Sequence, residues 1–338
     1  MTNLFKKAAW FTDIHYGMRN NARQHNEDCD EFIDWFIEQA KAKGCETCVF
    51  GGDWHHNRAS LNISTMKYSL DGLRKLNNAF EKVYFILGNH DLFYRETRDV
   101  NSVEFVKELP NIILIDSVLS EGDCTFVSWL VGDEWKKIPK IKSKYMFGHF
   151  ELPTFKLNAM VEMPDHGGLK SEMFTNQEFV FSGHFHHRQI KGNVIYTGSA
   201  FPHNFSDAGD DERGWMFLEW GSEPEFFAWP DAPKYKNITL SDLLVDPSKY
   251  LLPKTTARIT LDIDISYEEA NFIKDTFIEA YDLRDISLQP MKNTQHEEDT
   301  GAELHFETID EIVISQLNSI DDGGSFNKKI LVELYQNL

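Results

Sequence analysis

The sequence lacks any uninterrupted apolar run that approaches the roughly 18 residues of a membrane-spanning helix. Its first seven residues, Met1 to Lys7, also lack the long apolar stretch and the small-residue cleavage site of a secretory signal. We therefore expect a cytosolic protein with no membrane partner.

Cysteine is scarce, with four in 338 residues, which is too few for a disulfide framework in a chain of this size. Cys45 and Cys48 form a single C-x-x-C at the entry to an apparent strand, and no second pair stands nearby to complete a tetrahedral zinc site. We expect buried structural thiols here, with a redox role as the alternative.

Basic residues are outnumbered, since 34 lysines and arginines face 54 aspartates and glutamates, a formal net charge of -20. A protein that coats nucleic acid by itself needs the opposite balance. One basic run stands out, formed by Lys136, Lys137, Lys140, Lys142 and Lys144. A solvated connection is the slightly favoured interpretation, and a local contact with a DNA backbone is the other.

Short apolar runs recur in the first 181 residues and predict buried strands. They lie at 8–12, 47–50, 83–87, 145–147 and 178–181. Two segments with helical spacing lie between the first three runs. The first helix has one apolar face, formed by Phe32, Ile33, Phe36, Ile37 and Ala40, and the second repeats Met66, Leu70 and Leu73. This alternation predicts a layered α/β core with functional groups at the strand ends. The later runs at 194–197, 215–220 and 224–229 predict the second half of a sheet sandwich.

A polar cluster directly follows each of the first five runs. The clusters read Asp13-Ile14-His15, Gly51-Gly52-Asp53, Gly88-Asn89-His90-Asp91, Gly148-His149 and Gly183-His184-Phe185-His186. Carboxylate, amide and imidazole groups suit first-row divalent metals, and the set supplies enough ligands for two cations that share a carboxylate. Such a pair of metals hydrolyses phosphate esters. A single Gly-Asp or Gly-His would be weak evidence, whereas the ordered set is specific.

At these residues the sequence resembles the calcineurin-like metallophosphoesterase superfamily, whose pattern is D-x-H, G-D, G-N-H-D/E, H and G-H-x-H. The resemblance implies a four-layer α/β/β/α sandwich. It implies that one metal is held by Asp13, His15, Asp53 and His186, and that Asp53 bridges to a second held by Asn89, His149 and His184. His90 would then stabilise charge on the phosphoryl group and protonate the leaving oxygen, with Asp91 orienting His90.

Other histidines lie near these motifs. In the DNA-repair branch of the superfamily a histidine at the place of His56 positions the phosphodiester, while His55 has no clear match, so the sequence leaves open which of the two reaches the substrate. Motif two reads Gly-Asp-Trp-His-His in place of the commoner Gly-Asp-hydrophobe-Phe-His. The remaining candidates are expected behind the ligands or at the surface, with His166 the best outside candidate for a site-lining loop: His25, His166, His187 and His203.

Nearly end to end, the chain looks like the SbcD-type nuclease subunits in their T-even-like phage form. The features are Gly-Asn-His-Asp-Leu followed by Tyr94, and the stretches 181–186, 196–200 and 213–215. This resemblance implies an exonuclease and endonuclease that uses Mn²⁺, with Mg²⁺ as the alternative, on duplex ends and single strands. It also implies an SbcC-type coiled-coil ATPase partner, a homodimer formed by helices near 61–110, and a location in the host cytoplasm if a phage encodes the chain.

Three parts are expected along the chain: a nuclease domain at 1–235, a small α+β capping domain at 236–292 that contacts DNA, and an acidic linker with a helical tail at 293–338. The capping domain would contain a strand at 258–265, a helix at 267–280 and a strand at 285–290. Two arrangements of the tail are open: it docks on the ATPase, or it packs back on the body. Its helical periodicity does not decide between them. Its candidate contact residues are Ile309, Ile312, Val313, Leu317, Leu331, Leu334 and Tyr335.

Three rival functions remain. A small-molecule phosphodiesterase or phosphatase would have little use for the C-terminal helices, and a protein phosphatase would hydrolyse phosphoserine peptides. A non-catalytic scaffold would have lost ligands, and the intact set argues against it.

Overall fold

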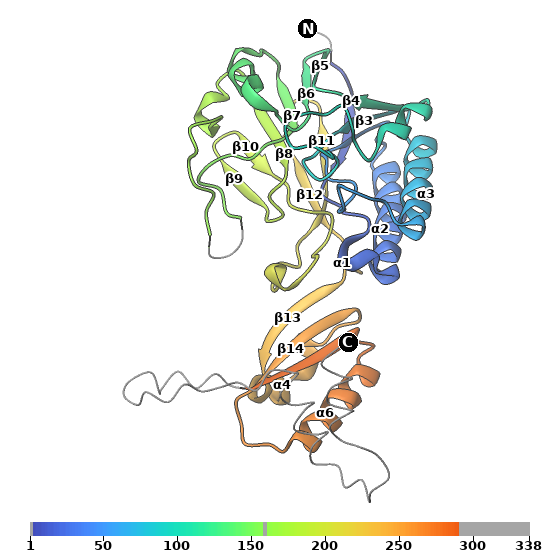
Figure 1. Ribbon diagram of the computed structural model, residues 1–338, viewed down its shortest axis with the longest axis vertical. Helices are drawn as coiled ribbons and strands as arrows, with labels where there is room; N and C mark the ends of the chain where they lie inside the picture. The colour runs from blue at the N-terminus through green and yellow to red at the C-terminus, as the bar shows by residue number, and fades with distance from the viewer. Residues whose placement is uncertain (1–2, 158–160, 291–338) are drawn as a thin grey trace, which may run out of the picture. The chain divides into compact units, whose positions relative to one another are not determined.

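The computed structural model describes residues 3–157 and 161–290, which contain three β-sheets (Figure 1). The linker and tail predicted for residues 293–338 lie outside the described residues. Within the described part, no helix is both long enough and apolar enough to cross a membrane.

The first sheet has the strand order β12-β11-β1-β2-β3-β4. Its strands are β1 (Lys7–Phe11), β2 (Thr47–Phe50), β3 (Lys82–Ile86), β4 (Ile112–Ile115), β11 (Gly214–Glu219) and β12 (Glu225–Ala228). β1 to β4 are parallel, so their carboxyl ends meet at one edge, whereas β11 runs antiparallel to β1 and β12 runs antiparallel to β11. Two of the strands expected in the other sheet, those at 215–220 and 224–229, thus extend the first sheet instead, and that expectation was wrong.

Helices α2 (Arg23–Ala42) and α3 (Ile63–Ala79) lie beside the first sheet (Figure 1). Phe32 and Phe36 of α2 pack in one core with Phe11 and Phe50 of the sheet. Met66 was expected on the buried face of α3 but is exposed, because the helix turns Thr65, Ser69, Leu73 and Leu76 inward. A polar contact on this inward face accompanies the apolar packing, since the indole of Trp54 donates to Ser69 Oγ at 2.8 Å.

The second sheet has the order β5-β6-β7-β8-β10-β9. Its strands are β5 (Val118–Glu121), β6 (Cys124–Val127), β7 (Tyr145–His149), β8 (Phe179–Gly183), β9 (Gln189–Lys191) and β10 (Val194–Tyr196). β6, β7, β8 and β10 are parallel. In the described residues its outer face is covered by loops and by 3-10 helices η2 (Gly132–Lys140) and η3 (Ser171–Met173). The sandwich is therefore confirmed, and this outer layer is built without α-helices.

The two sheets share an aromatic core. Along β1, Ala9 and Phe11 face the helices, whereas Ala8 and Trp10 face the second sheet and pack in a cluster with Phe147. This two-residue alternation explains why the strand reads as a nearly continuous apolar run.

The thiols of Cys45 and Cys48 are free and buried, as expected. Burial raises the pKa of Cys45 to about 11. The thiol is therefore protonated at neutral pH, which supports a structural role.

The third sheet is small and parallel, with order β13-β14-β15. It comprises β13 (Lys234–Thr239), β14 (Thr255–Leu261) and β15 (Asp285–Pro290), with α4 (Leu240–Val245), α5 (Pro247–Tyr250) and α6 (Tyr267–Ala280). Helix α6 and strand β15 are confirmed at the expected bounds, and β13 was missed. The unit has an apolar cluster of its own around Leu243, Ala257 and Ile286. Three short elements complete the chain: α1 (Met18–Asn21), η1 (Glu104–Glu108) and η4 (Phe205–Asp207).

Candidate metal centre

The five polar clusters lie at, or directly after, the carboxyl ends of strands β1, β2, β3, β7 and β8. Backbone bonds join the first two loops, because Asp13 N donates to Gly52 O at 3.0 Å and His15 N donates to Asp53 O at 3.1 Å. A hydrogen bond also joins the loops of the two sheets, because His149 Nδ1, at the end of β7, lies 2.7 Å from Gly51 O, just after β2. Residues far apart in sequence, such as His15 and His186 with a separation of 171, thus meet at one place.

The backbone at this place is unusual. Asp13, His15, Asp53 and His184 have φ values of 53°, 54°, 61° and 93°. Residues with a side chain rarely adopt this left-handed region, and such strain persists only where surrounding contacts enforce it. The carboxylate and imidazole groups are therefore held in place at an energetic cost, as is common in functional sites.

One group of ligand atoms gathers around His15. Its Nε2 atom lies 3.1 Å from His186 Nε2, 3.6 Å from Asp53 Oδ2 and 3.9 Å from Asp13 Oδ1. His186 Nε2 is also 3.9 Å from Asp13 Oδ1. Four potential metal ligands from three loops therefore lie close together, with His15 among them.

A second group gathers around Asn89. Its Oδ1 atom lies 3.1 Å from His149 Nε2 and 3.0 Å from His184 Nδ1. His149 Nε2 is 3.6 Å from Asp53 Oδ2, the same oxygen and the same distance that join Asp53 to His15. Asp53 thus belongs to both groups, and its other oxygen accepts from His90 N at 2.7 Å.

These spacings fit divalent cations. Ligands about 2.1 Å from a shared ion lie roughly 3.0–3.4 Å from each other, close to the separations observed here. Burial lowers the pKa of His186 to about 4 and places that of His15 well below its ordinary range, so both imidazoles are neutral with lone pairs to donate. Burial alone would raise the pKa of Asp53, but the charge of His149 and its hydrogen bond hold it well below the usual value.

Asp91 does not orient His90, and that expectation was wrong. Asp91 is fully buried, and its carboxylate accepts four backbone N–H bonds of 2.9–3.2 Å, from Asp53, Trp54, His55 and Gly88. It therefore organises the loop that carries Asp53. His90 is oriented instead by a 2.7 Å bond between its Nδ1 and the carbonyl of His56.

His55 and His56 differ in their contacts. His55 is buried, and its ring nitrogens bond to Ser102 Oγ at 2.9 Å and Ser69 Oγ at 2.7 Å. The His56 ring instead lies nearly parallel to that of His90, with centroids 5.3 Å apart. A ligand atom of His56 lies within 4.8 Å of those of His15 and His90, so His56 is the one beside the candidate centre.

Sequence reasoning missed Glu151. Its Oε2 atom lies 3.1 Å from His184 Nε2, so the carboxylate fixes the ring whose Nδ1 faces Asn89. Carboxylates commonly hold metal-binding histidines in this way. A usable signal was present, because Glu151 follows His149 by two residues at the same strand end.

The other candidate histidines divide as follows. His203 and His25 are buried behind the site, where their Nε2 atoms lie 2.9 Å from the carbonyls of Asp13 and His15. His187 pairs with Asp210 and is partly exposed, and His166 is exposed.

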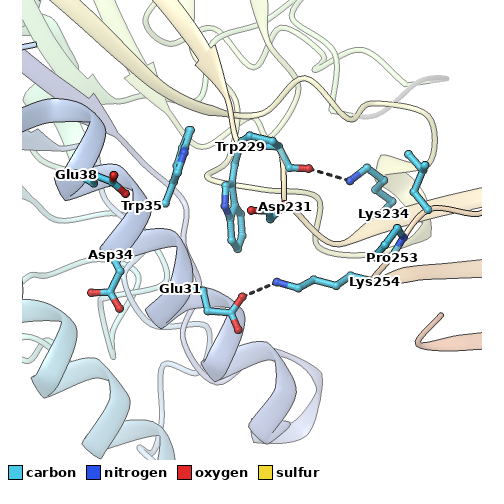
Figure 2. A pocket seen from close by; sticks show the side chains of 11 residues that line it. Glu31, Asp34, Trp35, Glu38, Trp229, Asp231, Lys234, Pro253 and Lys254 are labelled. Carbon is cyan, nitrogen blue, oxygen red and sulfur yellow. Dashed lines mark hydrogen bonds and ion pairs between the residues drawn. The ribbon is translucent and has the colours of Figure 1, made fainter. Parts of the chain in front are cut away.

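A separate cavity of about 540 Å³ is lined by none of the cluster residues (Figure 2). The rings of Trp35 and Trp229, 6.3 Å apart, line it together with four carboxylates and two lysines. The carboxylates belong to Glu31, Asp34, Glu38 and Asp231. Their charge disfavours a phosphate ligand, so this cavity is not the candidate site.

Comparison with protein families agrees with this geometry. Residues 6–188, more than half of the chain, match the family model described as calcineurin-like phosphoesterase. The chain belongs to this family. Its members are phosphoesterases that work with two metals, and the described residues hold a His and Asp cluster able to bind them.

One curated relative is exonuclease subunit 1 of Enterobacteria phage T4, which is 24% identical over 315 residues, 89% of each chain. Among solved structures, Pseudomonas putida nuclease MPE is 17% identical with a TM-score of 0.30, over 56% of this chain and 66% of that one. The Escherichia coli phosphoesterase YfcE is 14% identical with a TM-score of 0.37, over 67% of this chain and 94% of that one.

Proposed function

We propose that this protein is the nuclease subunit of an SbcC/SbcD-type complex and hydrolyses DNA phosphodiester bonds with two divalent cations, Mn²⁺ in preference to Mg²⁺. The observation that carries the proposal is the position of Asp53, whose Oδ2 lies 3.6 Å from the Nε2 atoms of both His15 and His149. One carboxylate oxygen thus joins two ligand groups. Asp13, His15 and His186 complete one site, and Asn89, His149 and His184 complete the other.

Two cations at these positions would acidify water for in-line attack and offset charge on the phosphoryl oxygens. The protein's own groups then bind and orient the substrate. His90 Nδ1 donates to His56 O, so a doubly protonated His90 ring would present its second N–H, at Nε2, to the phosphoryl group or the leaving oxygen. His56, stacked beside it, contacts the phosphodiester.

DNA is proposed as the substrate because the T4 relative, which matches 89% of this chain, is named an exonuclease subunit. The word subunit also supports a second protein in the complex, which we propose to be a coiled-coil ATPase held by the tail residues. The small domain at 236–292 would contact DNA. Exposed apolar side chains on and near α3 support a homodimer: Ile63, Met66, Phe93, Tyr94 and Val100.

The test is a nuclease assay on end-labelled linear duplex, hairpin and single-stranded DNA with Mn²⁺ or Mg²⁺, beside an Asp53→Asn control. We expect cleavage by the wild-type protein and loss of it in the variant. Hydrolysis of phosphoserine peptides or of small phosphodiesters with no cleavage of DNA would favour the rival phosphatases. Failure to bind metal in calorimetry would favour the scaffold.

The partner is tested separately. The full chain and a chain ending at residue 307 are each co-expressed with an SbcC-type coiled-coil ATPase, taken from beside this gene if one is encoded there. We expect only the full chain to co-purify with it. Equal co-purification would refute the role of the tail.

A further inference from the structure

A second pocket, of about 170 Å³, adjoins the Asn89 group of ligands. It lies among the end of β6, helix η2 and the end of β7, and its lining includes Trp129, Trp135, Phe150, Leu169 and, at the side of the candidate centre, His149 and Glu151. A group bound in it would therefore contact the ligand residues themselves.

The walls of this pocket are aromatic. The Trp129 ring centroid is 5.1 Å from that of His184 and 6.0 Å from that of His149. Trp135, on η2, is only partly buried although it is the largest apolar side chain of that helix. An indole beside a phosphoesterase centre offers a face on which a planar ring can stack.

Helix η2 is held rigidly against the loop that follows the His90 motif. Arg98 donates to both carboxylate oxygens of Glu134, at 2.8 and 2.6 Å, and to the carbonyl of Trp129 at 2.7 Å. The side chain of Arg98 is only 12% exposed. The two tryptophans are thus positioned before any ligand arrives, which lowers the entropic cost of binding.

The charge around the pocket is favourable to phosphate in spite of the acidic chain. The nearby carboxylates are engaged, because Glu134 binds Arg98, Asp133 binds Lys136 at 2.7 Å and Glu151 binds His184. Three lysines of the basic run, Lys137, Lys140 and Lys142, are exposed and form no ion pair with any described residue. They lie on or just after η2, the helix that carries Trp135, and lysines combined with aromatic side chains are typical of sites that bind single-stranded nucleic acid.

We propose that this pocket is a nucleobase subsite for single-stranded DNA. A base next to the scissile phosphate stacks on Trp135 and Trp129, and Lys137 and Lys140 contact the phosphates that follow. The proposal deepens the proposed function and rests on it for the substrate class.

The test measures binding of a single-stranded oligonucleotide that carries 2-aminopurine, in Ca²⁺, with a gel to verify that the oligonucleotide stays intact. Stacking on an indole quenches the fluorescence of this base. We expect Trp135→Leu to lose the quenching and to bind about 5- to 150-fold more weakly. Trp135→Phe, the matched control, keeps a ring and should stay within about fivefold of wild type.

The lysines are tested by salt dependence. Lys137→Gln/Lys140→Gln should lower the slope of log affinity against log salt by about 1.4, since each contact with a single strand contributes about 0.7. Lys41→Gln/Lys67→Gln changes net charge equally but lies on α2 and α3, and should leave the slope unchanged. All four of these lysines are exposed, so the comparison of the two double variants remains informative if Trp135→Leu does not fold.

The two proposals can fail separately. Wild-type quenching and affinity retained in Trp135→Leu and in the lysine variant would overturn the subsite, even if DNA is cleaved. Variants that bind weakly beside a wild-type protein that never cleaves DNA would support the subsite and overturn the nuclease function. Absence of any binding by the wild-type protein would overturn the subsite directly.

Discussion

Gly88 leaves no room for a side chain beside the shared carboxylate. A Cβ atom added at Gly88 would lie 2.1 Å from Asp53 Oδ1, 2.4 Å from Asp53 N and 2.8 Å from Asp53 Cγ. The substitution Gly88→Ala therefore tests the central geometry with a single methyl group, and it removes no ligand.

The size of the disturbance follows from these distances. Real Cβ contacts essentially never fall below 3.0 Å, so Asp53 Oδ1 must retreat from 2.1 Å by about 0.9 Å or more. A change of rotamer cannot relieve the clash with Asp53 N, so the backbone must move as well. We expect the variant to lose about 1–3 kcal/mol of stability from overpacking. Metal affinity should fall by about 100-fold or more, because mutating groups that only orient ligands already costs about 10- to 100-fold.

The assay is isothermal calorimetry with Mn²⁺, together with urea unfolding in EDTA. Gly168→Ala is the matched control, because a Cβ at Gly168 meets nothing within 4 Å and the backbone there is not left-handed. The control should stay within about 0.5 kcal/mol of wild type and keep its metals. Wild-type Mn²⁺ stoichiometry and affinity in Gly88→Ala would refute the placement of Asp53 between two cations.

Three further predictions follow from the site. His90→Asn should reduce cleavage by about 10²- to 10⁴-fold with Mn²⁺ affinity within about twofold, and an equal loss of metal would make His90 a ligand. Glu151→Ala should weaken Mn²⁺ binding by about tenfold, the lower end of the range because Glu151 is partly exposed, and calorimetry with unchanged affinity would contradict its role toward His184. Burial lowers the pKa of His149, but the charge of Asp53 outweighs it and raises the pKa to about 9. The stability that this pair gives the metal-free protein is present below about pH 6.5 and is lost as pH rises through 9. Because a ligand imidazole must be neutral, Mn²⁺ affinity should instead rise about tenfold per unit toward pH 9, and calorimetry in two buffers should detect a released proton at pH 7.5.

The local sequence was sufficient to predict where the candidate ligands gather. Each motif stands just after an apolar run, and the carboxyl ends of parallel strands meet at a shared edge, so Asp13, Asp53 and Asn89 were expected to converge. The bounds of β2, α6 and β15 were likewise readable from periodicity, because alternation and helical spacing are local properties.

The roles that sequence could not assign depend on contacts between distant segments. The neighbouring residues His55 and His56 have different contacts. His55 is hydrogen-bonded to two serines, whereas the His56 ring stacks on that of His90. Asp91 proved to anchor four backbone amides, which no motif reveals. The strands at 215–220 and 224–229 joined the first sheet because pairing with β1 is a long-range choice.

By itself, then, the order of residues determined the kinds of ligand, their spacing and the strands that precede them, because these depend on neighbours in the chain. Only the tertiary structure decided that one oxygen of Asp53 serves two ligand groups, that Glu151 holds His184 and that two tryptophans form a pocket beside them. Those facts are distances between side chains from different loops, and the packing of the two sheets sets them.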